Sequence, residues 1–194
     1  MNLFGFIKGK NTLKICENLY FETEEIKLKK LFEYLDLNRP SKVIYVAFFN
    51  DMLSFYPSQE NVFSFCACEI VDGKHDDFLS RLFLHNSCEV ILAQHYPLYS
   101  LEKMLFDKLK KLSNKEHVLT SFVSMEDMIL KNANSVKNQV EKVLSNWKSD
   151  SLRKKSESEL DEIMEKIQKE NDDKISIDLK ALSIEEWYST VKWK

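Results

Sequence analysis

The sequence predicts an α/β fold, a mixed sheet with helices on both faces, followed by a C-terminal α-helical hairpin or extended helical segment. Three observations predict it. Between residues 24 and 123, segments with helical spacing of apolar residues alternate with strand-like runs. Those runs are apolar on both alternating faces, which is typical of strands covered by helices on both sides. After Ser124, apolar residues recur at heptad spacing in a charged sequence.

The α/β part begins with a helix over 24–37, whose apolar residues recur at i, i+3, i+4 and i+7. The helix ends before Pro40, because the residue before a proline is displaced from helical geometry. The alternation that follows predicts at least one parallel pair of strands. The expected elements are a strand over 43–49, a possible short strand over 52–56, a strand over 61–71, a helix over 76–85, a strand over 88–95, a helix over 101–112 and a strand over 117–123.

The segment after Ser124 predicts helices with an apolar stripe that needs a partner. Apolar residues spaced alternately four and three apart form an a/d seam. They are Ile129, Ala133, Val136, Val140, Val143 and Trp147. A second, more charged helix follows a polar hinge near residue 150. The two helices either pair as an antiparallel hairpin, pack back on the α/β part, or dock on another chain.

An aromatic tail ends the chain. A strand-like piece over 175–179 precedes a capping box that starts at Ser183. Trp187, Tyr188 and Trp193 are side chains of the kind that dominate interface hot spots. We therefore expect an α/β domain over 1–123, a charged helical pair over 124–170 and the tail over 171–194.

Composition excludes several function classes. Lys and Arg number 28 against 31 Asp and Glu, so the net charge of −3 does not predict general nucleic-acid binding. No apolar run approaches the roughly 20 residues that cross a bilayer, and the N-terminus lacks a basic region before its apolar stretch, so we expect a cytoplasmic protein. All three glycines lie within the first 73 residues, which excludes a glycine-rich phosphate loop. No cofactor is predicted.

The four cysteines are Cys16, Cys66, Cys68 and Cys88. Paired thiolates at Cys66-Ala67-Cys68 would suit zinc or disulfide exchange. However, structural zinc sites usually place two to four residues between the cysteines, and no second pair is present. We interpret the pair as reduced core thiols on a strand.

Polar residues follow three of the predicted strands. If the strands that end at Asn50, His95 and Val123 are parallel, their carboxyl ends meet at one edge of the sheet. The residues gathered there would be Asn50, Asp51, His95, Tyr96, Ser124 and Glu126. Such a cluster suits acid and base chemistry or a metal. The alternative is that His95 is a half-buried edge residue and that Asp51 forms a turn.

A second interpretation concerns Asp51 and the segment Asp72-Gly73-Lys74, which could belong to a metal-dependent nuclease site. The order helix, three strands, helix and strand over residues 24–95 is similar to the core of the PD-(D/E)xK nucleases. That resemblance implies a Mg²⁺ site that activates water, with Asp51 as the first acid and Asp72 with Lys74 as the second motif. Glu69 joins Asp51 and Asp72 as a candidate metal ligand. Asp-Gly-Lys is also an ordinary turn sequence.

Two functions follow from these patterns. The first is an interaction or scaffold subunit, an α/β platform whose helical arm engages another protein or a second copy. Its predicted partner-binding residues are Ile129, Val136, Val140, Val143, Trp147, Trp187, Tyr188 and Trp193. The alternative is a metal-dependent hydrolase or nuclease that uses Asp51, Asp72, Lys74 or His95.

Overall fold

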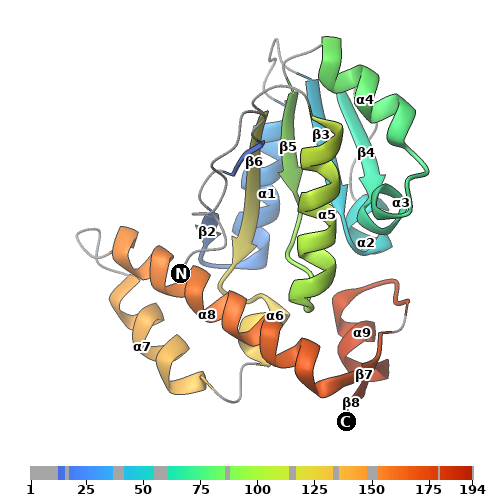
Figure 1. Cartoon of the computed structure of the whole chain (residues 1–194). Coiled ribbons are helices and arrows are strands. Elements are labelled where there is room, and N and C mark those ends of the chain that lie inside the picture. The colour runs from blue at the N-terminus through green and yellow to red at the C-terminus, as the bar shows by residue number, and fades with distance from the viewer. Residues whose placement is uncertain are drawn as a thin grey trace.

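The computed structural model shows a parallel sheet covered by helices on both faces and followed by further helices, which confirms the predicted fold class (Figure 1). It describes residues 13–15, 18–36, 42–54, 61–85, 88–113, 117–132, 136–147, 153–178 and 180–193. In chain order the elements are β1 (Leu13–Ile15), β2 (Leu19–Phe21), α1 (Glu24–Asp36), β3 (Lys42–Ala47), α2 (Asn50–Ser54), β4 (Val62–Cys66), α3 (Ala67–Val71), α4 (Asp76–His85), β5 (Cys88–Leu92), α5 (Tyr99–Leu112), β6 (His117–Ser124), α6 (Met128–Lys131), α7 (Lys137–Trp147), α8 (Arg153–Lys174), β7 (Ile175–Ile177), α9 (Ile184–Thr190) and β8 (Lys192–Trp193).

The strands of the main sheet lie in the order β1-β6-β5-β3-β4. β2 pairs with the carboxyl half of β6, next to the half that pairs with β1. Every described pairing in this sheet is parallel, where the sequence had predicted a mixed sheet. The antiparallel pair β7–β8 in the tail is separate from it.

Alternate residues of β3 pack against opposite layers of helices. Ile44 and Val46 belong to the core shared with α4 and α5, whereas Val43 and Tyr45 belong to the core shared with α1. β3 is therefore apolar from Val43 to Ala47, because both of its faces are covered. In Figure 1, α1 lies on one face of the sheet and α5 on the other.

Two predicted strands are wrong. Residues 50–54 form α2, whose Met52 is buried against the sheet and accepts a hydrogen bond from the Tyr45 hydroxyl at 3.0 Å. The predicted strand over 61–71 ends at Cys66 and continues as α3, with Ala67 and Ile70 on its buried side. β3 and β4 are therefore parallel strands joined through a helix, and the similarity to the nuclease core is not retained.

The heptad seam is divided between two helices and closed by a third. Ile129 lies on α6, and Val136, Val140 and Val143 lie at and within α7. All four are buried in the same core as Leu160 and other apolar residues of α8. Because α7 and α8 are joined by a short connection and pack along each other, they form the predicted antiparallel hairpin (Figure 1).

The long helix α8 lies on the side of the sheet where β6 and β5 have their carboxyl ends (Figure 1). Hydrogen bonds join it to residues that follow β5, including one from Gln168 Nε2 to the Tyr96 carbonyl at 2.6 Å. Within the described part of the chain, no helix has both the length and the apolar character needed to span a membrane.

Candidate functional site at the carboxyl edge of the sheet

The residues that follow the strands of the main sheet form its carboxyl edge. Open α/β sheets bind ligands at this edge, where neighbouring strands connect to opposite faces. β3 connects to α2, whose Met52 packs with the α1 layer, and β5 connects to α5, whose Leu105 packs in the opposite layer. The switch point therefore lies between β3 and β5.

His95 follows β5 at this edge and is only 2% exposed. Its Nδ1 lies 2.8 Å from Oε1 of Glu102, which is also buried. Its Nε2 lies 3.2 Å from Oδ1 of Asn18, whose Nδ2 donates to Asp161. With the Asn18 amide in this orientation Oδ1 is an acceptor, so His95 Nε2 carries a proton.

Asp161 of α8 closes the network from the other side. Its Oδ1 accepts hydrogen bonds from Asn18 Nδ2 at 2.8 Å and from the Tyr20 hydroxyl at 2.6 Å. Tyr20 lies on β2 and is 1% exposed. These bonds connect the start of the chain to α8 across more than 140 residues of sequence.

Further polar contacts fix α8 over the edge. Gln168 Nε2 donates to Glu102 Oε2 at 2.9 Å, and that oxygen also accepts the Tyr96 amide at 3.0 Å. Asn171 Nδ2 donates to the Pro97 carbonyl at 3.0 Å. Asp172 accepts the backbone amide of Ser100 at 2.9 Å, in the first turn of α5. α8 thus makes several hydrogen bonds with this edge, and its buried apolar residues share one core with α5, α7 and the sheet.

Burial and neighbouring charges shift the pKa values in the network. Burial lowers the pKa of His95, but the Glu102 carboxylate outweighs burial and leaves that pKa above the ordinary value. Burial raises the pKa of Asp127, which Lys27 partly offsets. Burial also raises the pKa of Asp161. The side chain of Lys27 is itself buried and forms an ion pair with Glu24.

In this closed arrangement the network holds structure together. Both ring nitrogens of His95 have partners, and the side chain is buried. Among the described residues, no three or more His, Cys, Asp or Glu side chains are grouped so that they could hold a metal ion. His95 is therefore in no position to contact a substrate while α8 is in place.

Tyr96 belongs to the His95 network, while Ser124, Glu126 and Asp51 make hydrogen bonds of their own. Ser124 is buried, and its Oγ accepts the Glu126 amide at 2.8 Å. Glu126 Oε2 in turn accepts the Glu24 amide at 2.9 Å. Asp51 lies in the first turn of α2, where its amide donates to the Leu182 carbonyl of the tail at 3.1 Å. Burial raises the pKa of Asp51.

The tail fills the switch point. Trp187 of α9 is fully buried and meets the Tyr96 ring edge to face at 5.9 Å. Its Nε1 donates to Asp178 Oδ1 at 2.7 Å, and the Tyr96 hydroxyl donates to the same oxygen at 2.9 Å. Phe49, after β3, stacks on the other side of this cluster with its ring 5.4 Å from that of Tyr96. The chain's own residues thus occupy the position where related architectures bind ligands.

The cysteine pair differs from its prediction. Cys66 is half-buried at the end of β4, and Cys68 is exposed on α3, so neither is a core thiol. Cys88 is buried at the start of β5, as predicted. Cys16 lies outside the described residues.

The candidate nuclease residues are on α3 and in the turn after it. Glu69 contacts Lys74 Nζ at 3.3 Å and His75 Nε2 at 3.2 Å. Asp72 is the C-cap of α3, and its amide donates to the Cys68 carbonyl. Gly73 follows with a φ of 81°, a conformation that glycine adopts without strain. Asp72-Gly73-Lys74 therefore forms the turn that the sequence allowed as the alternative.

The predicted partner-binding residues are mostly internal. Ile129, Val136, Val140, Val143 and Trp187 are at most 7% exposed and pack within the chain's own core. Tyr188 is half-buried against Trp187, with the ring centroids 5.0 Å apart. Trp193 is 46% exposed. The side chain of Trp147 lies outside the described part.

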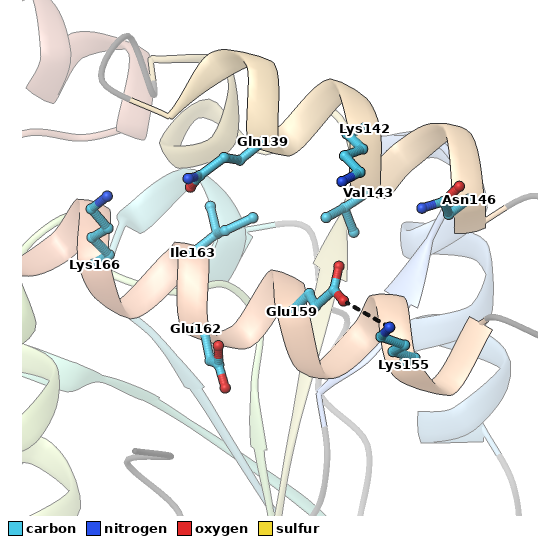
Figure 2. A pocket seen from close by; sticks show the side chains of 9 residues that line it. All are labelled: Gln139, Lys142, Val143, Asn146, Lys155, Glu159, Glu162, Ile163 and Lys166. Carbon is cyan, nitrogen blue, oxygen red and sulfur yellow. Dashed lines mark ion pairs between the residues drawn. The ribbon is translucent and has the colours of Figure 1, made fainter.

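A groove of about 380 Å³ runs along the outside of the hairpin. Figure 2 shows side chains from α7 and α8 facing each other across it. Val143 and Ile163 are its buried apolar residues. Its polar lining consists of Gln139, Lys142, Asn146, Lys155, Glu159, Glu162 and Lys166. Lys155 and Glu159 lie 3.9 Å apart, one turn along α8.

Sequence reasoning missed most of the buried network. Its unpredicted members are Asn18, Tyr20, Lys27, Glu102, Asp161 and Gln168. Glu102 gave one usable signal, because it falls on the side of the predicted helix over 101–112 that also carries Leu105 and Leu109. A charged residue at such a position indicates a buried partner.

No family model, no curated protein and no solved structure matches the chain.

Proposed function

We propose that the chain is an interaction protein, a scaffold subunit that associates with a second copy through the groove of its α7–α8 hairpin. The α/β part is the platform that holds the hairpin. Three free thiols support the further proposal that it works in the reducing cytoplasm.

The composition of the groove carries this proposal. An apolar floor with a charged rim is the usual anatomy of a protein interface. The rim holds three lysines and two glutamates, so it contains both signs in nearly equal number. In a twofold dimer the same patch meets itself and must contain its own complement. A patch of mixed charge satisfies that condition, whereas a patch of one sign does not.

The seam that first suggested a partner does not support this proposal, because its valines are buried inside the chain. The hydrogen bonds of α8 with residues that follow β5 support it, because they hold the hairpin in place with its groove outward.

The metal-dependent hydrolase has less support. Its acids Asp51, Glu69 and Asp72 do not form a group able to hold a metal within the described residues. Glu69 is already engaged by Lys74 and His75.

Sedimentation equilibrium of the full chain tests the dimer. We expect the average mass to rise with concentration towards twice that of the monomer. Lys142→Glu with Lys166→Glu reverses two charges of the rim and should restore the monomer. Lys29→Glu with Lys103→Glu makes the same charge change on α1 and α5 and should leave the dimer intact. A monomer at every concentration, or equal effects of both pairs, contradicts the proposal.

A further inference from the structure

Cys66 and Cys68 form a pair of neighbouring thiols at the carboxyl end of β4, with the single residue Ala67 between them. Each thiol shifts the pKa of the other. Cys68 is exposed and Cys66 is half-buried, so solvent reaches the pair. Cys88, in contrast, is 2% exposed, with its thiol directed at the Leu82 carbonyl. Two of the described thiols are thus accessible together.

The backbone between the two thiols suits a disulfide. Ala67 is the first residue of α3, and helical geometry at one intervening residue places the flanking Cα atoms about 5.4 Å apart. Disulfides span Cα separations of roughly 4.4–6.8 Å. The Cα separation of the pair is therefore within the range that a disulfide spans.

The two thiols differ in reactivity. The neighbouring Cys68 thiol lowers the pKa of Cys66 to about 6. The Cys66 thiol, burial and the nearby Asp178 and Asp72 raise the pKa of Cys68. At neutral pH, Cys66 is therefore the thiolate and Cys68 the thiol that holds the proton.

We propose that Cys66 and Cys68 are a redox-active dithiol that reduces a disulfide of neutral or cationic character. Cys66 sulfur attacks one sulfur of the substrate, the substrate S–S bond breaks, and the first thiolate leaves and takes up a proton. Cys68 then loses its proton and attacks the Cys66 sulfur, which releases the second substrate thiolate. The dithiol is oxidised to a disulfide and the substrate disulfide is reduced to two thiols.

The charges around the pair define the class of substrate. Asp72 and Asp178 act on Cys68, and both are acidic. Lys74 and His75 lie nearby, but both are engaged by Glu69. An anionic disulfide such as oxidised glutathione is repelled, and a cationic one such as cystamine is attracted.

Mass spectrometry of the full chain carrying Cys16→Ser tests this inference. We expect reaction with hydroxyethyl disulfide to remove two hydrogen atoms from the protein. Adding Cys68→Ser should stop the reaction at a mixed disulfide on Cys66. Adding Cys66→Ser should slow the first step about tenfold at pH 7, because the remaining thiol is protonated. Cys88 must stay unmodified throughout, which shows that each variant is folded.

The substrate preference has its own measurement. The rate with cystamine should fall as salt is added, and the rate with oxidised glutathione should rise. The proposal of a redox-active dithiol is wrong if the wild-type protein retains the mixed disulfide. It is also wrong if the two single variants react at equal rates. If added salt changes the rates with cystamine and with oxidised glutathione in the same direction, the proposed preference for cationic disulfides is wrong.

Discussion

Gln168 of α8 and Glu102 of α5 are joined by a buried hydrogen bond of 2.9 Å, although 66 residues separate them. The same Gln168 Nε2 also donates to the Tyr96 carbonyl at 2.6 Å. One side chain therefore connects the long helix to two groups at the carboxyl edge.

Gln168→Met keeps the shape of the side chain and removes both hydrogen bonds. Because it leaves a carboxylate oxygen and a carbonyl with fewer donors in a buried place, we expect a loss of about 1–3 kcal/mol in the free energy of unfolding. Urea unfolding measures it. Asn138→Leu, an amide replaced by an apolar group of similar shape at an exposed position of α7, should change stability by less than about 0.5 kcal/mol. A similar loss in both variants contradicts this role of Gln168.

Gln94→Met should not lower the free energy of unfolding, in contrast to Gln168→Met. Gln94 follows β5 and is 5% exposed, and its Nε2 has no hydrogen-bond partner in the described part of the chain. Replacing an unsatisfied buried amide with an apolar group of similar shape removes a desolvation cost. Urea unfolding should show unchanged or increased stability. A loss as large as that of Gln168→Met would mean that the Gln94 amide is satisfied in solution.

The raised pKa of His95 predicts that the stability of the fold depends on pH. Its pKa in the folded state is raised above the ordinary value of about 6.5, since Glu102 outweighs burial. The folded state therefore binds the proton more tightly than the unfolded state does. The stabilisation is complete below about pH 6.5 and is lost as the pH rises through the folded pKa. Urea midpoints measured from pH 6 to 9 should fall in the wild type and fall less in His95→Gln. His85→Gln, at an exposed histidine, should retain the wild-type slope.

The sheet and the hairpin were predictable because their signals extend over many residues. β3 is apolar from Val43 to Ala47, and the seam residues recur over nearly three heptads between Ile129 and Trp147. The change from strand to helix within residues 61–71 was not predictable. Ala67 and Ile70 fit the buried side of a helix as well as that of a strand, and short apolar runs do not distinguish the two. Only the fold shows that Asn18 meets Asp161, because no local pattern records a contact across 143 residues.

The apolar centre of the hairpin gives the last prediction. Leu160 of α8 is fully buried in the core that includes Val136, Val140 and Val143. Leu160→Ala removes buried methyl groups and leaves a cavity, so we expect a loss of about 2–5 kcal/mol. Leu182→Ala makes the same change at a side chain that is 63% exposed, where the expected loss is below about 0.5 kcal/mol. Thermal unfolding followed by circular dichroism compares the two. Equal losses would mean that the seam is open to solvent, and the valines would then again be candidates for binding a partner.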